Sequence, residues 1–181
     1  SIDVRRSTGS GFVSSRWLTQ KGPYEKPENT RQGWYAGDFD GDQRSDLAGS
    51  NLSGGAGEIT SVKIDVYLSN GQQLLAPQAW LSDSPGWTLF DGAVGDFFGT
   101  GRTGIRACVA GYDSNGRLLA PCLRTYPSTG ASFEDRIEQC GISLSSQKSG
   151  QPGSGQCLDS GDFLGDGRTS FANDQGFLYG N

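Results

Sequence analysis

Four aspartates lie within a nine-residue segment that has the spacing of a metal-binding loop. Asp38, Asp40 and Asp42 occupy its positions 1, 3 and 5, and Asp46 occupies position 9. Calcium takes six to eight oxygen ligands, and alternate carboxylates on a tightly curled loop can point at one centre. The backbone carbonyl of Arg44, at position 7, is a fifth expected ligand. Because carboxylates this close repel one another without a cation, the pattern predicts one calcium site.

The spacing excludes an EF-hand, although that loop also begins D-x-D-x-D. An EF-hand requires Gly at position 6 and a bidentate Glu at position 12, where this segment has Gln43 and Gly49. Magnesium prefers to keep several water ligands, so it suits four carboxylates less well than calcium does. The remaining alternative is an acidic turn that faces water without a metal.

The aspartate segment recurs twice in altered form, so the chain contains an internal repeat. Loops that begin at Gly37, Gly95 and Gly161 share the pattern G-D-F-x-G-x-x-R-[S/T], and we call them G-D-F loops. The second loop has lost most of the acidic side chains, and the third has lost about half, so we expect no calcium there. Asp96 and Asp162 are expected instead to accept hydrogen bonds from backbone N–H groups of their own turns. The shared aromatic and basic side chains are predicted to pack in the core and beside the loops: Phe39, Phe97, Phe163, Arg44, Arg102 and Arg168.

A second recurring element lies between the loops and predicts hairpin turns. The segments 7–12, 69–74 and 128–133 carry small residues with Gly near the tip, after strand-like runs. One unit therefore consists of a loop, two strands, a turn and another strand, which is about the size of a propeller blade. We expect a single domain over 1–181, with units at 37–94, at 95–160, and split between 1–36 and 161–181.

The composition favours many short strands joined by tight turns. The chain has 29 Gly, and its hydrophobic share is 34%, but 4 Trp, 9 Phe and 6 Tyr suffice to build a core. No segment has a sustained helical stripe of apolar residues. The predicted fold class is all-β, with propeller-like blades of short antiparallel strands. A closed propeller usually has four to eight blades, so the chain would form an open arc or part of a larger propeller.

The cysteines indicate disulfides and an oxidising compartment. Their number is even and no C-x-x-C spacing occurs, which disfavours a zinc site. A turn signal midway between Cys108 and Cys122 predicts that these two residues face each other across a hairpin. Cys140 and Cys157 flank the segment 142–156, which has the composition of a flexible linker, and are predicted to close it. Cys122–Cys140 is the main rival pairing, and buried free thiols are the other alternative.

Charge and missing residue types exclude several function classes. The net charge is −5 and no basic patch occurs, so nucleic acid is not an expected partner. Histidine is absent, which removes Ser-His-Asp and Cys-His nucleophiles and His-ligated zinc. No apolar run approaches the roughly 18 residues of a membrane span. Because methionine is absent even at position 1, we expect a processed piece of a longer protein with further domains. The expected disulfides favour a secreted or cell-surface location.

The loops resemble the FG-GAP/VCBS repeat family, known from integrin α-subunit propellers and many bacterial secreted proteins. The D-x-D-G-D-x-x-x-D match at 38–46 is the most specific part of this resemblance, which covers nearly the whole chain. The S-T-G-x-x-F elements are also similar to FG-GAP-like regions of bacterial Rhs/YD-repeat and SpvB/TcB-type toxin proteins. The resemblance implies a β-propeller, structural calcium in a blade loop, and a role in adhesion, binding or scaffolding, in virulence if the toxin likeness holds.

The sequence therefore predicts a calcium-stabilised, non-catalytic module that binds a protein or a glycan or serves as a scaffold. One alternative is a carbohydrate-binding propeller, in which exposed tryptophans stack on sugars. Another is a hydrolase that uses paired carboxylates, although no pair carries an identifying motif. The side chains considered for these alternatives are Trp34, Trp80 and Trp87 for sugar stacking, and Glu58, Glu134, Glu138 and the loop aspartates for hydrolysis.

Overall fold

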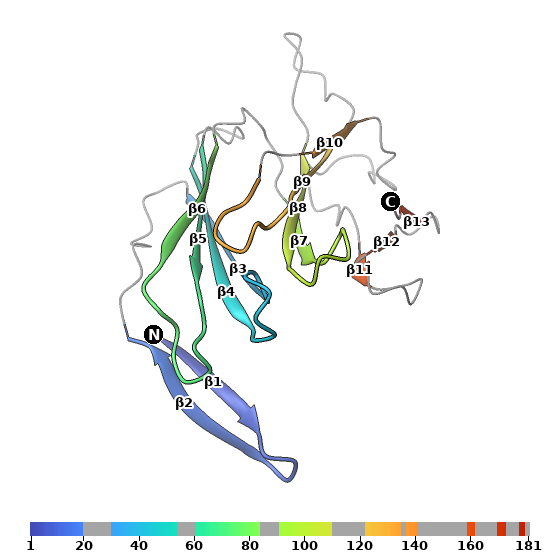
Figure 1. Ribbon diagram of the computed structural model, residues 1–181. Coiled ribbons are helices and arrows are strands. Elements are labelled where there is room, and N and C mark those ends of the chain that lie inside the picture. Colours follow the sequence, from blue (N-terminus) through green and yellow to red (C-terminus); the bar gives the residue numbers. More distant parts are fainter. Residues whose placement is uncertain are drawn as a thin grey trace, which may run out of the picture.

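Within the part of the chain that it describes, the structure, a computed structural model, is all-β and contains no helix (Figure 1). Every pairing between the described strands is antiparallel. These observations confirm the predicted fold class at this level. The described residues are 1–19, 30–53, 61–83, 91–109, 122–134, 137–140, 159–161, 170–172 and 178–179.

The first two sheets are four-stranded meanders, in which neighbouring strands also follow one another along the chain. In each sheet a G-D-F loop joins the first strand to the second, and a turn of the S-x-G type follows the third. The first sheet consists of β3 (Thr30–Gly37), β4 (Asp46–Ser53), β5 (Ser61–Tyr67) and β6 (Gln78–Asp83). The second sheet consists of β7 (Asp91–Gly95), β8 (Gly104–Val109), β9 (Cys122–Tyr126) and β10 (Ile137–Cys140).

Two smaller sheets complete the described strands. The N-terminal hairpin consists of β1 (Ile2–Ser7) and β2 (Phe12–Leu18), which pair only with each other among the described strands. The third sheet consists of β11 (Asp159–Gly161), β12 (Ser170–Ala172) and β13 (Leu178–Tyr179). The described strands of the segments 1–36 and 161–181 thus lie in separate sheets. Each four-stranded sheet starts with the strand that precedes its G-D-F loop, whereas the predicted units start at the loop itself.

The strand register reproduces the repeat that the sequence predicts. Each G-D-F loop is closed by paired residues at the same two positions of the repeat, and so is each S-x-G turn. The pairs that close the loops are Gly37 with Asp46, Gly95 with Gly104, and Gly161 with Ser170. The pairs that close the turns are Ser7 with Phe12, Ser69 with Leu74, and Ser128 with Phe133.

The main core lies between the first and second sheets. Alternate residues of β5, Val62, Ile64 and Val66, are fully buried on one face, because side chains at i and i+2 share a face of a strand. Phe39, from the first G-D-F loop, is also fully buried there. Phe97 of the second loop is buried too. The predicted core role is therefore confirmed for both side chains, whereas the predictions for Phe163 lie outside the described residues.

A second, smaller core lies on the opposite face of the first sheet, beneath the N-terminal hairpin. Tyr67 and Leu74 of the first sheet and its turn pack there with Leu18. Trp17 and Ile2 of the hairpin lie against this cluster. The first sheet thus packs against the second sheet on one face, and on the other face its S-x-G turn and the end of β5 pack against the hairpin.

The structure contradicts the predicted disulfide pairing. Cys122 is bonded to Cys140, the rival pairing, and their Cα atoms lie 4.0 Å apart at directly opposite positions of β9 and β10. The register of β8 and β9 places Cys108 opposite Leu123, one residue away from the predicted register. Cys122 is paired with Val109 instead, so the register does not place Cys108 and Cys122 at opposite positions. Cys157 and the segment 142–156 lie outside the described residues.

The residues that the structure describes include no helix long and apolar enough to cross a membrane.

Candidate metal centre

The first aspartate of the G-D-F loop organises the backbone around itself. Asp38 Oδ1 accepts hydrogen bonds from the N–H groups of Gly41 (2.7 Å) and Asp42 (3.0 Å), and its Oδ2 accepts one from Gln43 N (2.7 Å). Gly41 and Gln43 have positive φ angles of 85° and 68°, which curl the chain around the carboxylate. The sequence places Gly at only one of these two positions, so Gln43 adopts a backbone conformation that costs a non-glycine residue energy.

The second G-D-F loop has the same backbone frame, in which the first aspartate accepts hydrogen bonds from N–H groups of the loop and two residues have positive φ angles. It lacks the other carboxylates. Asp96 Oδ1 accepts a hydrogen bond from Thr100 N (2.9 Å), and Oδ2 accepts one from Gly101 N (2.7 Å). Gly99 and Gly101 have positive φ angles at the positions of the first loop's two left-handed residues. The expectation that Asp96 caps its own turn is confirmed, and Asp162 lies outside the described residues. The frame therefore forms without a full set of acidic side chains.

Three of the four predicted side-chain ligands converge in the first loop. One carboxylate oxygen from each of Asp38, Asp40 and Asp42 lies within 4.8 Å of the other two. Calcium–oxygen distances are about 2.3–2.6 Å, so oxygens on opposite sides of one ion are separated by about 5 Å. Carboxylate oxygens are also the hard ligands that calcium prefers, and the group therefore fits this ion.

The electrostatics of the group also favour a cation. Burial raises the pKa of the Asp40 carboxyl above its usual value, and repulsion from Asp42 and Asp38 adds to the rise. The guanidinium of Arg44 forms an ion pair with Asp42 and offsets part of this negative charge. The ion pair is half exposed on the arginine side, so water screens it. A divalent cation among the three carboxylates would remove the remaining repulsion.

Asp46, the fourth predicted ligand, lies outside this group of three. It is buried, with 2% of its surface exposed, and its Oδ2 accepts a hydrogen bond from Phe39 N (3.0 Å). Its Oδ1 accepts one from Ser69 N (2.8 Å), so Asp46 connects the loop to the S-x-G turn of the same sheet. Burial raises its pKa, and repulsion from Asp40 and Asp42 contributes. Each oxygen keeps a second lone pair, and the role of Asp46 as a calcium ligand stays a prediction.

The contact of Ser69 with the loop and the capping role of Asp46 are not among the predictions from the sequence. The signal for a contact between loop and turn was the recurrence of the S-x-G turn after each of the first two G-D-F loops. Arg44 strengthens the same contact, because its Nε donates a hydrogen bond to the Ser69 carbonyl (3.1 Å). Arg102 packs against the first loop, where a Cβ added to Gly41 would lie 3.1 Å from its Cγ. These contacts confirm the predicted placement of both arginines beside the loops, and Arg168 lies outside the described residues.

A second group of possible ligands, at the end of the second sheet, does not make a metal site. Cys122, Glu138 and Cys140 lie close together there, but the two sulfurs form the disulfide and are not thiolates. Glu138 pairs with the guanidinium of Arg124 at 3.0 Å. Glu134, also considered for hydrolysis, is exposed.

The tryptophans considered for sugar binding differ in exposure. Trp80 is only 4% exposed and packs edge-to-face on Phe133, so it belongs to the core. Trp34 is 45% exposed and lies beside Tyr67. Trp87, like Glu58, lies outside the described residues. Comparisons of this chain with family models, curated proteins and solved structures gave no match.

Proposed function

We propose that this chain is a calcium-stabilised, non-catalytic binding or scaffold module of a secreted or cell-surface protein, built from repeats of the FG-GAP/VCBS type. The observation that carries this proposal is the convergence of Asp38, Asp40 and Asp42 in one loop. The second loop keeps the same frame around Asp96 without these side chains, so the extra carboxylates of the first loop are not needed to form the frame. Their presence is best explained by a cation.

The proposed calcium ion would be held by Asp38, Asp40 and Asp42, with Asp46 and the Arg44 carbonyl as the further ligands. It would neutralise mutually repelling carboxylates and tie the loop together, which stabilises the folded chain by mass action. A catalytic metal site keeps an open position for water or substrate and surrounds it with acid–base groups. The chain has no histidine to act as a base near neutral pH, which supports a structural role.

Contacts between successive sheets support a propeller-like arrangement. The first strand of each sheet contacts the first strand of the next, since β3 contacts β7 and β7 contacts β11 (Figure 1). Propeller blades are likewise arranged around a central axis along one strand of each blade. We therefore propose that the sheets are blades of an open arc or of a larger propeller.

The disulfide supports the proposed location. Disulfides persist in oxidising compartments, and Cys122–Cys140 joins two strands of the second sheet. An association with a toxin protein rests on the sequence resemblance alone. A glycan is the alternative class of partner. Of the two candidate tryptophans that the structure describes, Trp34 is exposed and Trp80 is buried, so Trp34 is the one able to stack on a sugar.

Calcium titration tests this function directly. In calorimetry, the chain should bind one calcium ion, and calcium should raise the melting temperature relative to EDTA. A ligand at about 100 times its dissociation constant stabilises the folded state by roughly 2.7 kcal/mol. Asp40→Asn should abolish both effects, whereas Asp3→Asn, in an exposed ion pair with Arg16, should change neither. A chain that binds no calcium at millimolar concentrations would refute the proposal.

A further inference from the structure

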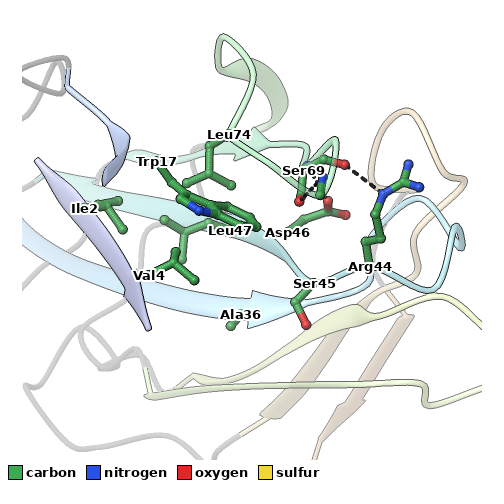
Figure 2. A pocket seen from close by; sticks show the side chains of 11 residues that line it. Ile2, Val4, Trp17, Ala36, Arg44, Ser45, Asp46, Leu47, Ser69 and Leu74 are labelled. Atoms are coloured by element: carbon green, nitrogen blue, oxygen red, sulfur yellow. Dashed lines mark hydrogen bonds between the residues drawn. The ribbon is translucent and has the colours of Figure 1, made fainter. Parts of the chain in front are cut away.

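A cavity of about 400 Å³ lies between the N-terminal hairpin and the first sheet (Figure 2). We call it the hairpin pocket. Ile2, Trp17 and Leu74 make its wall largely apolar, and Figure 2 shows these side chains gathered at one end of it. Ser69 and Arg44 lie at the other end, beside the first G-D-F loop. The exposed Ala36 also lines it, so the pocket can be reached from solvent.

Between the first and second sheets, the position that is equivalent to the hairpin pocket in the repeat is filled by the first G-D-F loop. Phe39 of this loop is fully buried and packs edge-to-face on Phe133, with ring centroids 5.9 Å apart. Its carbonyl accepts a hydrogen bond from the Ser128 hydroxyl (2.5 Å). The Asp38 carbonyl accepts one from Thr103 N (2.6 Å). One sheet thus inserts a loop phenylalanine into the next and fixes it with two hydrogen bonds.

The residues that receive this loop in the second sheet have equivalents in the first sheet, and those equivalents line the hairpin pocket. The equivalence follows from the repeat, because G-D-F loops and S-x-G turns align without gaps. The receiving residues are Phe133, Ser128, Gly130, Thr103 and Arg102. Their equivalents in the pocket wall are, in the same order, Leu74, Ser69, Gly71, Ser45 and Arg44.

The hairpin pocket also continues the established interface by one repeat. Phe133 N donates a hydrogen bond to the Trp80 carbonyl (3.2 Å) between the second and first sheets. Leu74 N donates the equivalent bond to the Trp17 carbonyl (3.3 Å) between the first sheet and the hairpin. The hairpin is therefore seated on the first sheet as β5 and β6 are seated on the second.

Two hydrogen-bond donors of the pocket wall occupy the same positions of the repeat as the two donors of the second sheet that bind the first G-D-F loop. Ser69 Oγ accepts a hydrogen bond from Gly71 N, as Ser128 Oγ does from Gly130 N. Ser128 also donates its hydrogen to a loop carbonyl, but within the described residues no acceptor takes the hydrogen of Ser69. Likewise, the N–H of Ser45 has no acceptor in the described ranges. The outer edge of β1 pairs with no described strand, whereas the equivalent edges of β5 and β9 pair with β4 and β8.

We propose that the hairpin pocket is the docking site for the G-D-F loop of a further repeat unit. The phenylalanine of that loop enters the pocket against Leu74. The two backbone carbonyls of the loop that correspond to those of Asp38 and Phe39 accept the Ser45 N–H and the Ser69 hydroxyl. The strand after that loop pairs with the edge of β1 that no described strand occupies. This inference goes beyond the calcium-dependent function, because the receiving contacts involve no metal ligand side chain.

A tandem variant of the full chain tests this docking site. A second copy of residues 30–62 is joined directly before Ser1, so that the copied strands precede β1 as β3 and β4 precede β5. Melting is measured in EDTA, which makes the result independent of the calcium site. We expect the melting temperature to rise by at least about 3 °C, as for a gain near 1 kcal/mol in a chain of this size.

Three variants show whether the gain depends on the pocket. Changing the phenylalanine of the copied loop to alanine should remove more than half of the rise. Ala36→Phe in the original chain fills the pocket at an exposed position, so it should remove the rise without unfolding the protein. Phe12→Ala, at the 74% exposed tip of the hairpin, is the matched control and should leave the rise intact.

Several outcomes would overturn the docking site. The inference is wrong if the tandem variant shows no rise, or if the alanine copy gives the same rise as the phenylalanine copy. It is also wrong if sedimentation shows that the unextended chain dimerises and that Ala36→Phe prevents this, since a second copy would then be the occupant. A failure of calcium binding with a preserved rise would refute the proposed function and leave the docking site standing.

Discussion

Replacing Asp46 by asparagine tests whether this residue supports the backbone hydrogen bonds of the first G-D-F loop independently of the carboxylate cluster. Asp46 accepts two backbone hydrogen bonds, from Phe39 N at 3.0 Å and from Ser69 N at 2.8 Å, and both donors belong to buried residues. Asparagine keeps the shape of the side chain, but its NH2 group faces one of these donors instead of an acceptor oxygen. One buried N–H is then left without a partner.

The expected cost follows from that single lost acceptor. A buried polar group without a partner costs about 1–3 kcal/mol. The substitution also removes a carboxylate whose pKa is raised by burial and by Asp40 and Asp42, and this relief offsets part of the loss. We therefore expect Asp46→Asn to destabilise the metal-free protein by about 1–2 kcal/mol. For a chain of this size, that change lowers the melting temperature by about 2–8 °C.

The assay is thermal unfolding in EDTA, with Asp42→Asn as the matched control. Asp42→Asn also removes a carboxylate from the cluster. That carboxylate accepts a hydrogen bond from the exposed Arg44 N and pairs with the half-exposed Arg44 guanidinium, so its loss should cost less than about 1 kcal/mol. Hydrogen exchange at Phe39 and Ser69 should accelerate in Asp46→Asn alone. Equal melting temperatures for the two variants in EDTA would refute the assignment of Asp46 to the frame.

Three further predictions follow from the loop and from the second sheet. Asp40 and Asp46 have raised pKa values, so the stability that they contribute is complete below about pH 3.8 and is lost as the pH rises through the raised values. The melting temperature in EDTA should therefore fall over this range of pH. In saturating calcium it should instead rise with pH, because the carboxylate ligands must be ionised to bind the ion. Gln43→Gly should stabilise the protein by about 0.5–1 kcal/mol in urea unfolding, because relief of the positive φ exceeds the entropic cost of glycine, and a clear destabilisation would contradict the strain. Non-reducing peptide mapping should find Cys122 joined to Cys140, and reduction should cost up to about 3 kcal/mol; a Cys108–Cys122 peptide would contradict the observed register.

The parts of the fold that the sequence predicts are those that depend on contacts between residues close in the chain and that recur in the repeats. The G-D-F loops and S-x-G turns recur within the chain, so each copy supports the interpretation of the others. Asp38 and Asp96 cap their turns through N–H groups at most five residues away, and such contacts follow from turn chemistry. The convergence of the first three loop aspartates is local for the same reason.

The parts that the sequence does not predict depend on register or on distant contacts. The disulfide prediction assumed a symmetric turn between Cys108 and Cys122, and a shift of one residue changed which side chains share a face. The two bonds of Asp46 depend on how the loop closes and on a turn that lies 23 residues further along the chain. The residue types do not show the register, and the recurrence of the turn indicates a repeated unit without showing which groups of the loop and the turn meet.

The insertion of Phe39 into the second sheet has a consequence for folding kinetics. The ladders within each sheet join consecutive strands, so short loop closures can form them early. The bond from Ser128 to the Phe39 carbonyl instead joins residues 89 positions apart and requires both sheets to be in place. Contacts made this late are mostly absent from the folding transition state, so their removal accelerates unfolding more than it slows folding. Phe39→Leu should therefore shorten the lifetime of the native state while leaving the refolding rate nearly unchanged.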